Sequence, residues 1–171
     1  MLRRHDDPLA DTPRLIRRVY GYVAFRIGPG PDAEDVTSEV FERALRYRDS
    51  FDREKGTPTA WLLGIAQRTV DDALRRRAAQ AFRPADDETL GGRDDADTVS
   101  RIVVQRALGQ LGDRDRNLLA LRYGVGLSTK QIAAALDLKP GAVDVALHRA
   151  RERLSQALAG QDDVPVVAEA G

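Results

Sequence analysis

The sequence predicts an all-α protein of two small helical domains, and three observations support that fold class. Apolar residues recur every three or four positions in several segments of the 171-residue chain. Glycine and proline separate these segments, as in residues 28–31. An acidic stretch without apolar periodicity divides the chain and is typical of a flexible linker. We therefore expect domains at residues 1–82 and 98–159, a linker at 83–97 and a disordered tail at 160–171.

Three helices are expected in the first domain. Thr12 is expected to cap the first helix and Asp32 the second, because a side-chain oxygen there can accept a free backbone N–H. Thr57 and Pro58 open the third helix, which we expect to run from about residue 60 to residue 81. The apolar stripe predicted for the first helix comprises Ile16, Val19, Tyr20, Val23 and Ile27.

Two short helices are expected at the start of the second domain. The first covers residues 99–111, and Asp113 is expected to cap the next. The Gly124–Gly126 segment then ends that second helix.

Residues 127–154 follow the pattern of a helix-turn-helix motif. Ser128 is a good N-cap, and Gln131 three residues later completes a capping box. Asp137 can adopt the left-handed conformation of the turn, and Pro140 suits the first turn of the next helix. The buried stripe of that helix is expected to be Val143, Leu147, Ala150 and Leu154. Such a motif usually places its second helix in the major groove of DNA.

The composition argues against several classes of protein. The chain has no cysteine and only two isolated histidines, so we expect no metal site and no cofactor. We find no plausible catalytic set of side chains and no phosphate-binding glycine loop, so we expect no enzyme. The absence of a long apolar run or secretory signal predicts a cytoplasmic protein without membrane insertion. A net charge of zero argues against tight, independent binding to DNA.

Two segments together resemble one protein family. Residues 32–46, followed by residues 51–77, are similar to the second conserved region of bacterial sigma factors, and residues 104–154 are similar to the fourth. Their order, and the absence of a domain between them, match the small extracytoplasmic-function group. The resemblance implies a promoter-specificity subunit that binds core RNA polymerase and promoter DNA, and that an anti-sigma factor commonly inhibits.

The resemblance also implies the residues that bind these partners. The residues expected to meet the polymerase share one helix face: Asp35, Ser38, Glu39, Glu42 and Arg46. Those expected at the minus-ten element are Gln67, Arg68, Asp72, Arg75 and Arg76. Those expected at the minus-thirty-five element are Lys139, Ala142, Asp144, Val145, His148, Arg149 and Arg151. The chain departs from the family pattern at Ser38, where glutamine is frequent, and at Arg68, where asparagine is common.

Three alternatives stay open at this point. The acidic helix face and the arginine run could be ordinary solvated surfaces. The helix-turn-helix could belong to a dimeric transcriptional regulator that acts without polymerase, with the N-terminal helices serving for dimerisation or ligand binding. It could also serve only to pack or to bind protein, as in a helical adaptor without a role on DNA.

Overall fold

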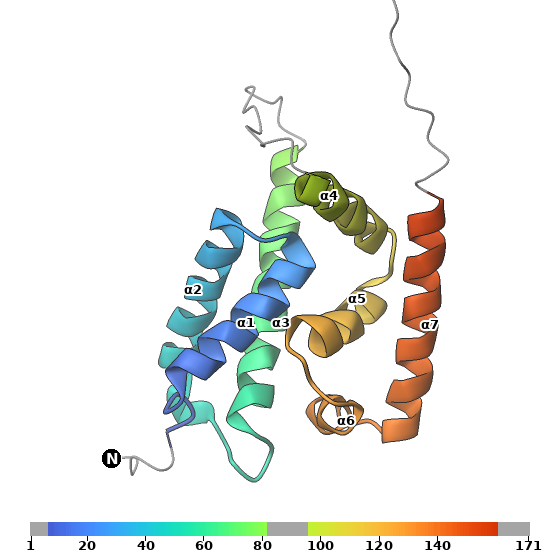
Figure 1. Cartoon of the computed structure of the whole chain (residues 1–171). Helices are drawn as coiled ribbons and strands as arrows, with labels where there is room; N and C mark the ends of the chain where they lie inside the picture. Colours follow the sequence, from blue (N-terminus) through green and yellow to red (C-terminus); the bar gives the residue numbers. More distant parts are fainter. Residues whose placement is uncertain (1–6, 82–95, 161–171) are drawn as a thin grey trace, which may run out of the picture.

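The computed structural model describes residues 7–81 and 96–160, and all regular structure in these two ranges is helical. The elements are α1 (Thr12–Ile27), α2 (Pro31–Arg46), η1 (Arg48–Ser50), α3 (Pro58–Ala81), α4 (Ala96–Gly109), α5 (Asp113–Leu119), η2 (Ala120–Gly124), α6 (Thr129–Leu136) and α7 (Pro140–Ala159). Helices α1 to α3 form an N-terminal bundle, and α4 to α7 form a C-terminal bundle (Figure 1). The all-α prediction is confirmed.

The N-terminal bundle is built on apolar faces that pack three helices against one another. Its core contains Leu15, Val19, Val23, Val36, Val40, Ala44, Leu62, Ala66 and Val70. The predicted stripe of α1 is wrong at Ile16, which is 44% exposed, while Leu15 and Tyr22 are buried. The buried face of α1 is therefore rotated toward Leu15, because α1 contacts α2, α3 and the C-terminal bundle at once.

Two predicted caps of the N-terminal bundle are wrong, whereas Thr57 and Pro58 open α3 as predicted. The first residue of α1 is Thr12, whose hydroxyl donates to the carbonyl of Leu9 at 2.6 Å instead of capping. Helix α2 begins at Pro31, before Asp32, and Gly30 precedes it with φ of 126°, which glycine tolerates best. The hydroxyl of Thr57 does accept the N–H of Ala60 at the start of α3.

The helix-turn-helix prediction is confirmed in its local detail. Ser128 and Gln131 form the capping box in both directions. Asp137 has the left-handed φ of 53°, and α7 begins at Pro140. Val143, Leu147 and Ala150 are buried, and Leu154 is half-buried. One turn of π-helix, η2, precedes the motif. In it the Val125 N–H donates to the carbonyl of Ala120, five residues earlier.

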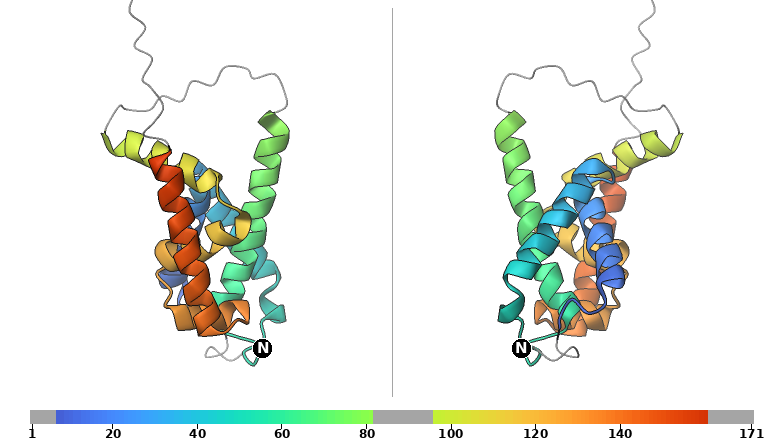
Figure 2. Two further views of the ribbon diagram at one scale, coloured as in Figure 1. Left: turned by 90° about the vertical axis from the view of Figure 1, so that its right-hand side faces the viewer. Right: turned by 90° about the vertical axis from the view of Figure 1, so that its left-hand side faces the viewer.

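The predicted linker and tail fall largely outside the described residues. Residues 82–95 and 161–171 lie outside them, while Ala96 and Asp97 belong to α4 rather than to a linker. Helix α7 lies on the side of the C-terminal bundle that faces away from the N-terminal bundle in Figure 1, and it lies in front of the other helices when that side is turned toward the viewer (Figure 2, left). The domain boundaries stay predictions.

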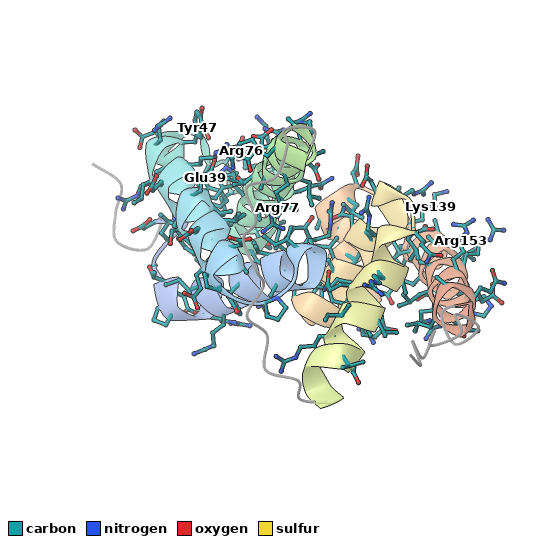
Figure 3. The ribbon with its side chains drawn as sticks, turned by 90° about the horizontal axis from the view of Figure 1, so that it is seen from above. Glu39, Tyr47, Arg76, Arg77, Lys139 and Arg153 are labelled. Carbon is teal, nitrogen blue, oxygen red and sulfur yellow. The ribbon has the colours of Figure 1, made fainter. Side chains whose placement is uncertain are left out.

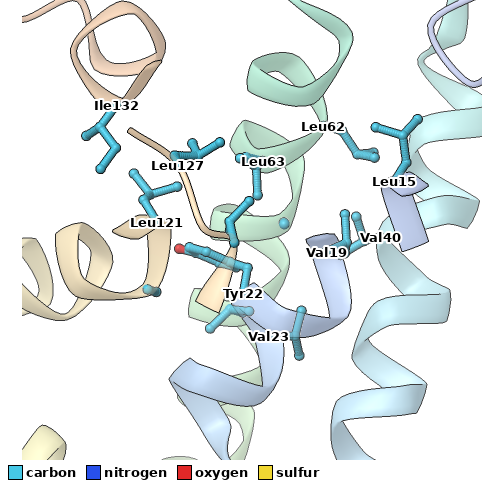
Figure 4. Close-up of a cluster of buried hydrophobic side chains, with 14 of the residues drawn as sticks. Leu15, Val19, Tyr22, Val23, Val40, Leu62, Leu63, Leu121, Leu127 and Ile132 are labelled. Carbon is cyan, nitrogen blue, oxygen red and sulfur yellow. The ribbon is translucent and has the colours of Figure 1, made fainter. Parts of the chain in front are cut away.

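The two bundles share one apolar core. Tyr22 of α1 and Leu63 of α3 lie beside residues of the C-terminal bundle in Figure 4. Those residues are Leu121, Leu127 and Ile132. Helix α1 also packs against η2. The hydroxyl of Tyr22 donates to Oδ1 of Asn117 at 2.6 Å, so a buried hydrogen bond crosses the same interface.

Candidate functional site

The predicted polymerase-binding residues form one face of α2. Asp35, Ser38, Glu42 and Arg46 are exposed, and Glu39 is half-buried. Leu45 belongs to the same face, because it lies two helical turns after Ser38, and its side chain is 60% exposed. The sequence analysis missed Leu45. The sequence does hold one sign that Leu45 is exposed, because Leu45 directly follows Ala44 and so falls outside the buried spacing of Val36, Val40 and Ala44.

An ion-pair network joins this face to the arginine run of α3. Arg43 bonds Glu39 at 2.6 Å through one terminal nitrogen and Asp72 at 2.9 Å through the other. Arg76 bonds the second carboxylate oxygen of Glu39 at 2.9 Å, and Arg75 bonds Asp72 at 2.5 Å. Figure 3 shows Glu39 and Arg76 facing each other between the two helices. One predicted polymerase residue and three predicted DNA residues therefore belong to a single cluster.

Arg43, which links the cluster, was not among the predicted site residues. The available signal was the spacing of Glu39 and Arg43, four residues apart on one helix. Its second partner, Asp72, lies 29 residues further along the chain, and only the packing of α2 on α3 brings the two together.

The network lowers the pKa of both carboxyl groups. Burial acts to raise the pKa of Glu39, but hydrogen bonds from Arg76 and Arg43 outweigh it, so the pKa lies below its ordinary value. Hydrogen bonds from Arg43 and then Arg75 lower the pKa of Asp72. The ion pairs therefore stabilise the fold above the ordinary carboxyl pKa, and this contribution is lost as the pH falls through the lowered values.

The remaining minus-ten candidates lie on α3. Arg68, Arg75 and Arg76 are exposed, and Gln67 and Asp72 are half-buried. The side-chain carbonyl of Gln67 accepts a hydrogen bond from Nδ2 of Asn117 at 3.4 Å. One predicted base-reading residue is thus already bonded to the C-terminal bundle.

The minus-thirty-five candidates lie on α7 and on Lys139 just before it. All seven side chains are exposed: Lys139, Ala142, Asp144, Val145, His148, Arg149 and Arg151. Oδ1 of Asp144 accepts a hydrogen bond from the Thr129 hydroxyl at 2.9 Å, so it also ties α7 to α6. Nε2 of His148 lies 3.3 Å from Glu152 on the same helix. Val145 is 52% exposed.

A further ion pair holds α7 in place. Arg153 of α7 bonds the nearly buried Asp115 of α5 at 2.5 Å. Arg122 of η2 donates to the carbonyl of Leu127 at 2.8 Å and braces the start of the helix-turn-helix. Lys139 and Arg153 lie at the opposite end of the molecule from Glu39 and Arg76 (Figure 3). The two candidate DNA surfaces are thus on different bundles and far apart.

The comparison with known proteins agrees with these two bundles. Residues 13–80 match the Sigma-70 region 2 family, and residues 101–154 match the Sigma-70 region 4 family. The ECF RNA polymerase sigma factor SigD of Mycobacterium tuberculosis is 36% identical over 165 residues, which cover 85% of this chain and 74% of SigD. The chain belongs to the ECF, or extracytoplasmic-function, group of RNA polymerase sigma factors. Sigma factors are transcription-initiation factors.

Other relatives of this sigma factor extend the comparison. The ECF sigma factor SigW of Bacillus subtilis is 27% identical over 171 residues, covering 89% of each chain. The solved structure of CnrH in complex with the cytosolic domain of CnrY has a TM-score of 0.59 and 28% identity, and the match covers 89% of this chain and 85% of CnrH. RpoE of Bartonella quintana, solved with the anti-sigma factor NepR, has a TM-score of 0.61 at 20% identity, with 87% of this chain and 94% of RpoE covered.

The sigma factor shows no membrane-spanning helix in its described ranges, because no helix there is both long and apolar enough. The family resemblance seen in the sequence is confirmed by these matches. The roles of the individual site residues stay predictions.

Proposed function

We propose that this sigma factor binds core RNA polymerase in the cytoplasm, directs it to promoters and helps to open the duplex. The N-terminal bundle reads and melts the minus-ten element, and the C-terminal bundle reads the minus-thirty-five element. An anti-sigma factor holds the protein inactive. The observation that carries the proposal is the pairing of an exposed α2 face with an arginine-rich α3 in one bundle and an exposed helix-turn-helix in the other.

The polymerase contact rests on the α2 face. Its exposed charges surround Leu45, so the face combines an apolar anchor with a polar rim, as protein interfaces commonly do. The ion pairs of Arg43 hold α2 against α3 in the free protein. Polymerase binding therefore does not carry the entropic cost of ordering this surface.

The DNA contact rests on two exposed surfaces. Arg75 and Arg76 extend from α3, where they can neutralise phosphates of a strand whose bases are unpaired. Arg149 and Arg151 extend from α7 and are suited to phosphates, while Asp144 and Val145 are nearer the helix start, where base edges are usually contacted. An Asp can accept a hydrogen bond from a cytosine amino group, and a valine can contact a thymine methyl.

An anti-sigma partner is proposed from the relatives. RpoE was solved with an anti-sigma factor and CnrH with the cytosolic domain of CnrY. Both matches cover most of this chain, including both of its bundles. We therefore propose that an anti-sigma factor binds these bundles.

Charge reversal at Glu42 should weaken the binding of core polymerase at least tenfold. Glu42 is exposed on the α2 face and outside the Arg43 network, whereas reversal at Glu39 would also break ion pairs to α3. We would measure affinity by fluorescence anisotropy and run-off transcription from a cognate promoter. Glu54→Lys is the matched control, since Glu54 is an exposed acid outside this face. If the wild-type protein does not bind core polymerase, the proposed function is wrong. If charge reversal at Glu42 and Glu54→Lys leave the same affinity for polymerase, the polymerase-binding surface is not the α2 face.

Asp144→Asn should shift the base preferred at one minus-thirty-five position by roughly 5- to 100-fold, the range expected for one base contact. The amide keeps one oxygen for the Thr129 hydroxyl, but it replaces the second carboxylate oxygen, which could accept from the cytosine amino group, with an NH2 group that can only donate. A promoter library transcribed by the reconstituted holoenzyme measures the preference. Gln156→Ala, an exposed change near the far end of α7, serves as control. Equal loss on all library members would show that Asp144 positions α7 without reading bases.

A further inference from the structure

Helix α7 is held by a hydrogen bond on each flank of its buried stripe. The stripe consists of Val143, Leu147, Ala150 and Leu154. Near the start of α7, Oδ1 of Asp144 accepts a hydrogen bond from the Thr129 hydroxyl of α6 at 2.9 Å. Near its end, Nη1 of Arg153 donates to Oδ2 of Asp115 in α5 at 2.5 Å. At about 100° per residue, Asp144 lies roughly 90° to one side of the stripe and Arg153 roughly 90° to the other. The two bonds therefore tie opposite flanks of α7 to two different helices.

The two bonds fix the rotation of α7 about its own axis. Apolar contacts along the stripe have no preferred direction, whereas a hydrogen bond weakens steeply when it is bent. The exposed residues Val145, His148 and Arg149 lie on the side of the helix opposite the stripe. A rotation of about 10° would move a side-chain tip that is about 6 Å from the helix axis by about 1 Å. A hydrogen bond of about 3 Å to a base edge does not survive that displacement.

Asp115 can act on base preference only through α7. Its side chain is 12% exposed, whereas that of Arg153 is 58% exposed. A nearly buried carboxylate left without a cation is costly, so the pair favours the one rotation of α7 in which it forms. Asp115 belongs to α5 and lies outside the candidate DNA surface of α7. A change in base preference caused by Asp115 must therefore be transmitted by the recognition helix.

Arg153 has one alternative role, as a phosphate contact beside Arg149 and Arg151. A phosphate contact predicts equal weakening on all sequences when it is removed, together with a smaller dependence of DNA binding on salt. The structure favours the positioning role, because Nη1 of Arg153 already donates to the carboxylate of Asp115. The two roles differ in whether base preference changes.

We propose that Asp115 and Arg153 are a positioning pair that sets the rotation of α7, and thereby the minus-thirty-five bases that its outward side chains prefer. Thr129 braces the opposite flank of the helix through Asp144. The orientation of α7 by the pair is independent of the proposed function, and the effect on base preference rests on it.

Three variants separate positioning from phosphate contact. Asp115→Ala removes the nearly buried charge and leaves Arg153 to solvent, so no buried charge stays unpaired. Arg153→Ala and the double variant complete the cycle. Asp113→Ala is the matched control, because Asp113 is an exposed acid of α5 whose pair with Arg116, at 2.5 Å, lies within α5. Circular dichroism establishes that each variant is folded, and Arg153→Ala changes a largely exposed side chain.

Backbone amide resonances of α7 test the orientation without polymerase. Val145 and His148 are five or more residues from Arg153, so they report on the whole helix and not on the site of substitution. Asp115→Ala and Arg153→Ala should both move these two resonances in the same direction, while Asp113→Ala should leave them in place. Resonances of Val145 and His148 that stay at their wild-type positions in Asp115→Ala would overturn the positioning role.

A library of minus-thirty-five sequences transcribed by the reconstituted holoenzyme tests base preference. In Asp115→Ala, the preference for the best sequence over its single-base variants should fall by roughly five- to tenfold, the lower part of the range for one base contact. The double variant should match Asp115→Ala, and affinity for core polymerase should not change. Asp113→Ala should keep the wild-type preference.

Two results would contradict the effect on base preference. The first is equal loss on all library members in Asp115→Ala. The second is a double variant that is weaker than Asp115→Ala on every sequence and less sensitive to salt, which would make Arg153 a phosphate contact. If wild-type protein gives no promoter-specific transcript, the proposed function is wrong, and the amide resonances still decide whether the pair orients α7.

Discussion

Replacing Ile132 by alanine should lower the free energy of unfolding by about 3 kcal/mol, in one transition that both bundles share. Ile132 is 0% exposed on α6 and belongs to the core that includes Leu121 and Leu127 as well as Tyr22 and Leu63. Removing three carbons leaves a cavity that helices from both bundles surround. For a chain of this size the melting temperature should fall by about 10 °C.

The single tryptophan allows the shared transition to be tested. Trp61 is in α3 of the N-terminal bundle, where it packs edge-on against Phe51 at 5.6 Å between ring centres, whereas Ile132 is in the C-terminal bundle. Trp61 fluorescence and far-ultraviolet circular dichroism should therefore shift together. Ile102→Ala is the matched control, since Ile102 is 47% exposed, and it should cost less than about 1 kcal/mol. A Trp61 transition unmoved by Ile132→Ala would show that the bundles unfold independently.

Tyr22→Phe should lower stability by about 1–2 kcal/mol near neutral pH and should remove a marked loss of stability in alkali. The hydroxyl joins Arg26 to Asn117, and its removal leaves the buried Asn117 oxygen without this donor. Burial raises the pKa of Tyr22 to about 12, despite the opposing effect of Arg26. The folded state thus keeps the phenol proton where the unfolded state releases it.

The sign of this pH dependence follows from the raised pKa. The contribution of Tyr22 is complete below pH 10 and is lost as the pH rises from about 10 to about 12, which amounts to about 2–3 kcal/mol. Urea unfolding at pH 7 and pH 11.5 gives the free energy of unfolding lost in alkali, and the contribution of Tyr22 is the difference in that loss between the wild type and Tyr22→Phe. Tyr47→Phe, at an exposed tyrosine, should leave the alkaline loss in place. If Tyr22→Phe loses as much stability between pH 7 and pH 11.5 as the wild type does, groups other than Tyr22 cause the alkaline loss.

The candidate site could be predicted in part. Helical spacing and family resemblance placed the candidate residues on exposed faces of α2 and α7, and all of them are exposed except Glu39, which is half-buried. They could not show that Arg43 joins Glu39 to Asp72, or that Thr129 bonds Asp144, because these partners come from different helices. Nor could they show that Ile16 is exposed, since the buried face of α1 depends on three neighbours together.

The sequence by itself determined the local structure of this protein. The Ser128 capping box, the left-handed Asp137 and the start of α7 at Pro140 depend on groups a few residues apart, whose preferences act without the rest of the chain. Only the tertiary structure decided how the bundles meet. The Tyr22–Asn117 hydrogen bond joins residues 95 positions apart. Gly21, inside α1, lies so close to Gly124 of η2 that a Cβ added to it would be 2.2 Å from the Gly124 carbonyl oxygen, and the sequence gives no sign of this contact. Such contacts depend on the position and rotation of whole helices, which are set by packing a shared core.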